Sequence, residues 1–327
     1  MADLARLPPR NGAALARVVD PVAQAELRAL QSDATPAKTH ATYTSSWFCF
    51  VEWCDEQGRS PLPASADTLA HYILSLNKRG LSVSTANVAL AAIVREHQEQ
   101  NVHCERYDPA VRKAFAGMAR RLSERLPAKR SALTVDLLAK VVAVQPATLA
   151  GVRNRALLLL GFATATRSNE LARLEVEDVR FESRAQGTVR IRRSKTDQEG
   201  KGAFVPIYRA KRRELCPMQA LRDWTIAAGI RSGPLFRPID RFGRVGKAAI
   251  QCQTVYDIVK QSCERAGMDP RLFGSHSLRA GFVTSATRKG VPLEVIMRTT
   301  RHKNINTLLG YVREIKAMEN GAGKDLL

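Results

Sequence analysis

The sequence predicts a mainly α-helical protein with a small antiparallel β-sheet, arranged in two domains. Three observations support this fold class. The chain has 327 residues, more than one hydrophobic core usually serves. Apolar residues make up 45% of it and recur mostly at three-to-four spacing, the period of helices that bury one face. Only one region, around residues 188–207, has two strand-like runs separated by a polar turn that contains glycine.

Residues 1–37 are rich in Ala, Arg and Pro, and we interpret them as a flexible N-terminal tail with a short helix at Pro21–Leu30. A long helix follows and stops at Gly58. Its apolar side chains recur at helical spacing: Tyr43, Trp47, Val51 and Cys54, with Phe48 and Phe50 widening the stripe. Such a stripe predicts a core face rather than aromatic rings that stack on bases.

Residues 38–127 are predicted to form one helical bundle. After the first helix, Ser65 or Asp67 caps a second and Ser82 or Ser84 caps a third. Asp108 followed by proline starts the last one. The predicted later helices are 68–78, 87–98 and 110–126. The last helix is strongly basic, and it carries Arg112, Lys113, Arg120, Arg121 and Arg125.

Residues 128–327 are predicted to form the second domain, after a basic linker at 127–130 that includes Lys129 and Arg130. Residues 152–163 are so apolar that this helix must be buried. The expected elements are helices at 135–144, 152–163, 217–228, 254–266, 277–289, 292–299 and 305–312, a short helix after Arg167 followed by the entry of a strand within residues 163–181, and strands at 188–193 and 203–207.

The net charge of +20 indicates a polyanionic partner, most often nucleic acid and second an anionic membrane surface. The apolar runs disfavour a membrane protein, since Ala156–Ala163 is far shorter than the roughly 20 residues that a spanning helix needs. The N-terminal residues hold no apolar segment typical of export.

The six cysteines lack metal-ligand spacing, which favours free thiols in a reducing compartment over zinc or disulfides.

A phosphodiester that reacts without a metal needs cationic donors on its non-bridging oxygens, a proton shuttle and a nucleophile. The stretch from Ser275 to Tyr311 offers all three types: His276 and Arg279 lie one helical turn apart, and His302 and Tyr311 follow. Each residue alone also fits a structural role, because tyrosines commonly bury the ring and satisfy the hydroxyl.

Two segments earlier in the chain hold further candidates. Arg167 follows the buried helix, and Glu170 can pin its guanidinium so that the fork faces a phosphate. Lys195 lies in the basic turn between the two predicted strands, near Lys201, where a lysine can reach into a groove as a proton donor. An ordinary salt-bridged arginine and a solvated hairpin lysine are the competing interpretations.

The joint order of these residues resembles the tyrosine recombinase (phage integrase) family. Its signature is an arginine followed three residues later by an acid, a β-hairpin lysine, HxxR, and a histidine or tryptophan nine residues before the nucleophilic tyrosine. Two departures are present: Ala165-Thr166 instead of the common Gly-Leu before the first arginine, and Thr300-Arg301 instead of Leu-Gly before the histidine. Arg301 is expected to alter the local turn or to add a phosphate contact.

The resemblance implies a role for each residue. Tyr311 attacks a DNA phosphate and forms a 3′-phosphotyrosyl intermediate, while His276 is the candidate base and Lys195 the candidate acid for the leaving 5′-oxygen. Arg167, Arg279 and His302 bind the non-bridging oxygens, with Glu170 as a supporting residue. No metal, cofactor or ATP is expected, since the covalent link conserves the energy of the phosphodiester.

The family match also implies an architecture and partners. The organisation is closest to Cre-type members: a helical core-binding (SAM-like) domain and an α+β catalytic domain that form a C-shaped clamp around DNA. The expected partners are double-stranded DNA sites and three further copies of the chain, a homo-tetramer on two sites, with a monomer or weak oligomer when free. This places the protein in the cytoplasm, at the nucleoid. The expected DNA contacts are Arg112, Arg120, Arg121, Arg125, Lys129, Arg130 and Lys201.

Three alternatives remain open from the sequence. A type IB topoisomerase shares the arginine, lysine, histidine and tyrosine chemistry but relaxes supercoils as a monomer. A non-catalytic DNA-binding regulator of the same fold would have no use for Tyr311. A metal-dependent nuclease is the last alternative, because no carboxylate cluster of the two-metal kind is evident.

Overall fold

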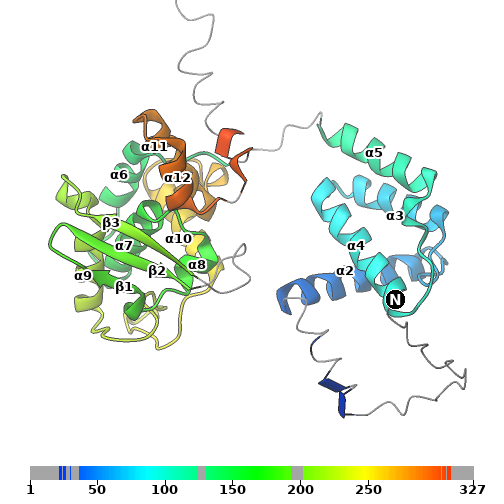
Figure 1. The fold of residues 1–327 in the computed structure, drawn as a ribbon, viewed down its shortest axis with the longest axis horizontal. Helices are drawn as coiled ribbons and strands as arrows, with labels where there is room; N and C mark the ends of the chain where they lie inside the picture. Colours follow the sequence, from blue (N-terminus) through cyan, green and yellow to red (C-terminus); the bar gives the residue numbers. More distant parts are fainter. Residues whose placement is uncertain are drawn as a thin grey trace, which may run out of the picture. The chain divides into compact units, whose positions relative to one another are not determined.

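The structure, a computed structural model, is drawn in Figure 1. The chain divides into two units, Met1–Pro127 (unit 1) and Ala128–Leu327 (unit 2), and each buries a hydrophobic core of its own. The residues that the structure describes are 22–23, 25–26, 30, 37–123, 130–192, 202–302, 304–306 and 308–310. Most of the predicted N-terminal tail and the end of the predicted basic helix lie outside these residues.

Unit 1 is a bundle of helices that begin and end close to the predicted positions. The side-chain oxygen of Ser65 accepts a hydrogen bond from the N–H of Thr68, and that of Ser82 accepts one from Thr85. Both serines satisfy helix N–H groups that have no partner within the helix. The helices are α2 (Ala37–Glu56), α3 (Ala66–Lys78), α4 (Val83–Glu99), the 3₁₀ turn η1 (Glu105–Tyr107) and α5 (Pro109–Ser123).

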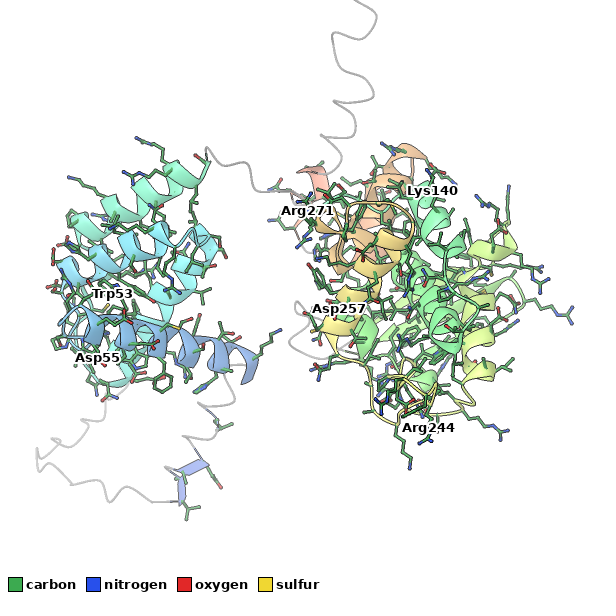
Figure 2. The ribbon with its side chains drawn as sticks, turned by 180° about the vertical axis from the view of Figure 1, so that it is seen from behind. Trp53, Asp55, Lys140, Arg244, Asp257 and Arg271 are labelled. Atoms are coloured by element: carbon green, nitrogen blue, oxygen red, sulfur yellow. The ribbon has the colours of Figure 1, made fainter. Side chains whose placement is uncertain are left out.

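The aromatic stripe of α2 is a core face, as predicted, with one correction. Phe50 and Cys54 are completely buried, and Trp47 packs against them. Phe48, which was expected to widen the stripe, is 63% exposed. A helix turns by about 100° per residue, so a residue two positions from Phe50 lies on nearly the opposite face. In Figure 2 the side chain of Trp53, which also packs on this core, lies among the helices of unit 1.

Unit 2 is mainly helical with a small sheet on one side (Figure 1). The helices are α6 (Val135–Ala143), α7 (Leu149–Ala163), α8 (Ser168–Ala172), α9 (Pro217–Ala227), α10 (Cys252–Arg265), α11 (Ser275–Arg288) and α12 (Leu293–Thr300). Four 3₁₀ turns occur in the described chain, and those of unit 2 are η2 (Val176–Asp178), η3 (Arg213–Leu215) and η4 (Pro270–Leu272). The strands are β1 (Val179–Phe181), β2 (Gln186–Ile191) and β3 (Ala203–Tyr208).

The sheet of the described residues has three strands in the antiparallel order β1-β2-β3. β2 and β3 correspond to the two strands predicted with bounds, and β1 lies where the entry of a strand was predicted. β1 is only three residues long, too short for a visible alternation, and it forms because Val179 pairs with Val189 of β2. On β2 and β3, Val189 and Val205 face each other and point into the core, while Phe204 points outward and is 64% exposed. The sheet thus has one buried face and one exposed face.

The core of unit 2 is built on α7. Its leucines from Leu157 to Leu160 are buried, as the apolar run predicted, and they pack with the inward-facing residues of the sheet and with Trp224 of α9. The observed architecture confirms the predicted fold class, a mainly helical chain with a small antiparallel sheet.

Candidate active site

The turn that joins α7 to α8 holds Arg167 in place. Ala165 in this turn has a left-handed backbone, with φ of 47°, and Arg167 is the N-cap residue of α8. The backbone N–H of Arg167 donates to Glu170 Oε2 at 3.0 Å, and its guanidinium pairs with Glu170 Oε1 at 2.9 Å. The guanidinium is therefore pinned from one side, and its side chain remains 23% exposed.

Arg279 of α11 reaches the same turn. Its Nη1 donates a hydrogen bond of 2.7 Å to the carbonyl oxygen of Ala165, although the two residues are 114 positions apart. Arg279 is only 3% exposed, so its charge is weakly screened by water. Because Arg279 follows His276 by three residues on α11, the two side chains lie on one face of the helix.

His276 lies in the first turn of α11, and its side chain remains accessible to solvent. Burial lowers the pKa of its imidazole, and the nearby charges of Arg279 and Arg167 lower it further. A histidine with a lowered pKa is neutral near pH 7 and has a nitrogen that can accept a proton. This is the protonation state that a general base requires.

His302 comes directly after α12 and is also half-buried. Its Nδ1 lies 2.8 Å from the hydroxyl oxygen of Thr300, and that hydroxyl donates its own proton to the carbonyl oxygen of Ile296 at 2.8 Å. The ring N–H is therefore assigned to Nδ1, with Thr300 as its acceptor. Burial, and then the charges of Arg279 and Arg167, lower the pKa of His302 to about 4.

The fields of Arg167 and Arg279 act on both histidines, and His276 itself contributes to the lowered pKa of His302. Four of the predicted site residues thus lie within electrostatic reach of one another, from helices far apart in the sequence. An anion that enters this site gains from both guanidinium groups, which makes the site suited to a phosphate.

Arg301 is a site residue that the predicted set omitted. Its Nη2 donates to Glu170 Oε2 at 2.7 Å, so Glu170 lies between Arg167 and Arg301. The side chains of Arg301 and Glu170 are 10% and 4% exposed. The only signal in the sequence was an arginine where the family usually has glycine, and a sequence position does not reveal a partner 131 residues away.

Tyr311, Lys195, Lys201, Arg125 and Lys129 lie outside the described residues. Their immediate neighbours are described in part. Leu308, three residues before Tyr311, is fully buried with Val283 of α11 and Ile296 of α12. The chain that leads to Tyr311 is therefore anchored on the two helices that carry His276 and precede His302.

The strand that leads to Lys195 is also anchored. Arg192 follows β2, and its guanidinium pairs with Glu175 at 2.5 Å and with Asp178 at 2.7 Å. These residues and Glu170 line one cavity of about 520 Å³. The base of the segment that contains Lys195 thus lies close to the carboxylate that pins Arg167.

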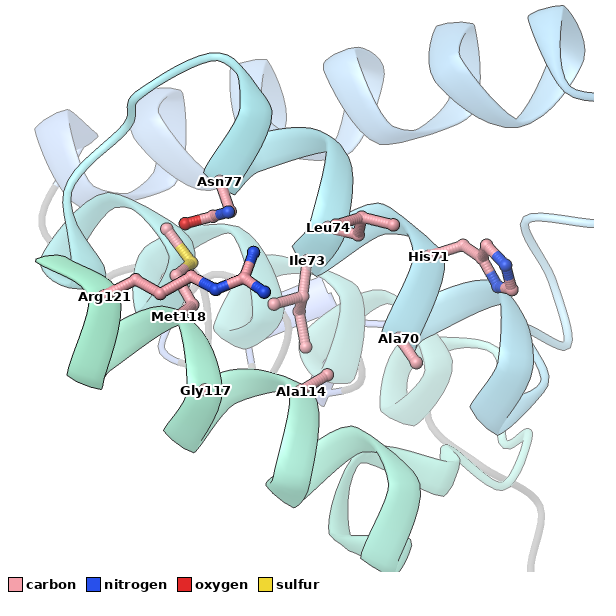
Figure 3. A pocket seen from close by; sticks show the side chains of 9 residues that line it. All are labelled: Ala70, His71, Ile73, Leu74, Asn77, Ala114, Gly117, Met118 and Arg121. Carbon is pink, nitrogen blue, oxygen red and sulfur yellow. The ribbon is translucent and has the colours of Figure 1, made fainter.

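The predicted DNA contacts Arg112, Arg120 and Arg121 are exposed on α5. A groove of about 340 Å³ lies between α3 and α5, and Ile73 and Met118 are among its apolar lining residues. Figure 3 shows these side chains from close by. The guanidinium of Arg121 reaches across this groove toward α3 (Figure 3). The groove therefore combines apolar surface with a cation at its side.

Arg130 has partners within unit 2. Its Nη1 donates to the carbonyl oxygens of Arg271 and Phe273 at 2.8 and 3.1 Å, and its guanidinium carbon lies 5.6 Å from the centre of the Tyr256 ring. The side chain of Arg271 is 86% exposed and lies at the periphery of unit 2 (Figure 2). Arg130 thus attaches the start of unit 2 to the segment before α11, and its contact with DNA stays a prediction.

All six cysteines are free. Within the described ranges, no group of three or more His, Cys, Asp or Glu side chains could hold a metal ion. Across the same residues, none of the helices has the length and apolar character needed to span a bilayer.

The fold and the site define a class of protein: one unit is a helical bundle, and the other holds a site with two arginines and two histidines. Comparison with known proteins identifies this class. Residues 132–318 match the model of the phage integrase family. An integrase/recombinase XerD homolog of Selenomonas ruminantium is 33% identical over 288 residues, which is 87% of this chain and 84% of that protein. The recombinase Cre of Escherichia phage P1 is 23% identical over 303 residues, which is 86% of this chain and 84% of that protein.

Among solved structures, the XerH site-specific recombinase in a post-cleavage complex with its palindromic difH substrate has a TM-score of 0.65 at 21% identity, covering 87% of this chain and 79% of that one. A λ integrase dimer bound to a core site has a TM-score of 0.58 at 16% identity, with coverages of 88% and 75%. The fold is thus that of the tyrosine recombinases. The chain belongs to the phage integrase family.

Proposed function

We propose that this protein is a site-specific DNA recombinase in which the phenolic oxygen of Tyr311 attacks a phosphodiester of duplex DNA. A bond forms between Tyr311 and phosphorus, the bond from phosphorus to the 5′-oxygen breaks, and the DNA 3′ end becomes linked to the protein. A free 5′-hydroxyl then attacks the phosphotyrosyl link and releases Tyr311. No external energy source is needed, because one phosphodiester replaces another.

The observation that carries this proposal is the meeting of Arg167 and Arg279 at one turn. The Ala165 carbonyl holds Arg279, and Glu170 holds Arg167. Fixed guanidinium groups stabilise the charge that gathers on the non-bridging oxygens in the transition state, and removing one such donor typically costs about 10²–10³-fold in rate. The anchored Leu308 supports delivery of Tyr311 to the same site.

The two protons have separate carriers in this proposal. His276, neutral because its pKa is lowered, takes the proton of the Tyr311 hydroxyl. Lys195 gives a proton to the departing 5′-oxygen. His302 donates from Nε2 to a non-bridging oxygen, which requires its imidazolium form, since Nδ1 already donates to Thr300. Binding of a phosphate therefore raises the pKa of His302 from its low value in the free chain.

The partner is double-stranded DNA, and we propose that the two units clamp it, with Arg112, Arg120 and Arg121 of α5 among the phosphate contacts. Further predicted contacts are Arg125, Lys129, Arg130 and Lys201. Four chains, monomers or weak oligomers when free, would assemble on two sites and exchange strands in pairs. The support is the basic charge of the chain and the family to which it belongs. Such an enzyme would act at the nucleoid.

The test is a search for a covalent adduct. Genomic fragments that the protein binds supply the target site, which is then made as a duplex with a nick near the cleavage position, so that rejoining is prevented. In EDTA, the native protein should give a protein–DNA species that survives denaturation. Tyr311→Phe should bind the same duplex with unchanged affinity and give no adduct.

A second assay separates recombination from relaxation. A plasmid with two target sites should yield recombinant circles, whereas supercoils in a plasmid with one site should persist. Relaxation of the one-site plasmid without recombinants would favour a type IB topoisomerase. Binding without any adduct on the nicked duplex would favour a non-catalytic regulator.

A further inference from the structure

The loop between α12 and His302 has an uncommon backbone. Arg301 caps α12 in the left-handed region, with φ of 58° and ψ of 38°, and its N–H donates to the carbonyl oxygen of Met297 at 2.7 Å. Glycine adopts this conformation without strain, whereas other residues occupy it at a cost. An arginine at this position therefore needs a compensating interaction.

The side chain of Arg301 supplies that interaction inside the site. Its Nη2 pairs with Glu170 Oε2, and its Nη1 donates to the carbonyl oxygen of Thr299 at 3.2 Å. Glu170 is buried and binds Arg167 through its other oxygen. The carboxylate of Glu170 thus joins two guanidinium groups. One belongs to Arg301, next to His302 in the sequence, and the other belongs to Arg167, the N-cap residue of α8.

We propose that Arg301 is a positioning residue that ties the His302 loop to Arg167 through Glu170. The tie joins two residues that are 131 positions apart in the sequence. It aligns His302 with Arg167 without contact between Arg301 and the DNA. The inference rests on the proposed function, since the aligned groups are the proposed phosphate ligands.

The competing role is direct binding of a DNA phosphate. The geometry disfavours it: both terminal nitrogens of Arg301 are engaged by protein oxygens, and the side chain is 90% removed from solvent (10% exposed). The two roles predict different effects when Arg301 is substituted. Loss of a tie slows the reaction of bound DNA, whereas loss of a phosphate contact weakens binding.

The experiment measures single-turnover cleavage of the nicked target duplex at saturating protein, together with the Kd. Arg301→Met and Arg301→Gly should each lower the cleavage rate by about 10–100-fold, with Kd within about threefold of native. Arg301→Lys, which keeps the charge but lacks the planar fork, should recover part of the rate. Arg298→Met, which removes an exposed arginine of the same helix, is the matched control and should cleave at the native rate.

Arg301→Gly is the decisive variant, because glycine suits the left-handed backbone and removes only the side chain. Native cleavage by this variant would overturn the proposal. A large rise in Kd with native cleavage at saturation would assign Arg301 to phosphate binding instead.

Thermal unfolding without DNA tests the interaction between Arg301 and Glu170 even if the protein forms no adduct with DNA. Arg301→Met, Glu170→Gln and the double variant are melted side by side. If the two side chains are coupled, the Tm loss of the double variant should be smaller than the sum of the single losses, by about 2–4 °C. Additive losses would contradict the tie. Absence of any adduct with the native protein would reject the proposed function alone.

Discussion

At the residue scale, the neighbours of His302 decide how it is protonated. Thr300 accepts from Nδ1, and the half-buried ring lies in the positive field of Arg279, Arg167 and Arg301. Burial is the larger cause of the lowered pKa, and the charges add to it. The free site is thus prepared for an anion: it is rich in positive charge, and His302 becomes a better donor only when a phosphate arrives.

Acidification should destabilise the free chain through His302. The pKa of this imidazole falls from its ordinary value of 6.5 to about 4 in the folded chain. Between these values the unfolded chain binds more protons, so stability falls as the pH drops through this window, and the loss is complete below about 4. Tm values of native protein and His302→Gln, measured from pH 7 to 4, should differ in slope, with the native slope steeper. Parallel curves would contradict the lowered pKa.

At the scale of elements, close packing of α11 against the start of unit 2 positions the site. A Cβ added at Gly281 would lie 1.9 Å from the carbonyl oxygen of Leu133. The chain runs past the helix so closely that the N–H of Leu133 donates to the carbonyl oxygen of Ser277 at 2.9 Å. The glycine of the HSLRAG segment therefore serves the packing of the helix that carries His276 and Arg279.

Gly281→Ala should destabilise unit 2 by about 2 kcal/mol, because the helix or the Leu133 segment must move to admit a methyl group. For a unit of this size, the loss corresponds to a decrease in Tm of about 4–8 °C. Gly117→Ala on α5 is the control, since a Cβ there meets nothing within 4 Å. By helix propensity it should stabilise unit 1 by about 0.5–1 kcal/mol. Equal effects of the two substitutions would contradict the close approach seen at Gly281.

At the scale of the whole molecule, the net charge of +20 governs association with DNA. Exposed cations occur on both units, for example Arg121 on α5 and Arg244 in the loop between α9 and α10, at the periphery of unit 2 in Figure 2. Cations that neutralise phosphates release counterions from the duplex, so binding should be strongly weakened by salt.

With about six to ten phosphate contacts for each chain, affinity should fall by about 10³–10⁵-fold between 50 and 200 mM salt. Arg121→Met should reduce the slope of log K against log salt by about 1, whereas Arg121→Lys, which keeps the charge, should leave it unchanged. Titrations of a labelled target duplex at several salt concentrations measure both slopes. An unchanged slope in Arg121→Met would remove this residue from the DNA contacts.

Local patterns in the sequence were sufficient to predict the helices, the two longer strands and the order of the candidate site residues along the chain. Helical spacing, serine caps and the apolar run at residues 152–163 depend only on residues close together in the chain, so the sequence alone reveals them. The entry of a strand was predicted where β1 lies, but its bounds and its pairing with β2 were not, because strand pairing depends on other elements. The exposure of Phe48 was not predicted either, since the face that a helix buries depends on its neighbours. The grouping of Arg167, Glu170 and His276 in the predicted set came from family resemblance rather than from such patterns.

The tertiary structure alone decided which distant groups of the site contact one another. Arg279 donates to the Ala165 carbonyl, and Arg301 shares Glu170 with Arg167. These contacts join residues that are 114 and 131 positions apart. Such partners are selected by the packing of α7 and α8 with the start of α11 in the main core of unit 2, and of α12 on α11 in a second cluster. Packing depends on the whole fold rather than on any local pattern.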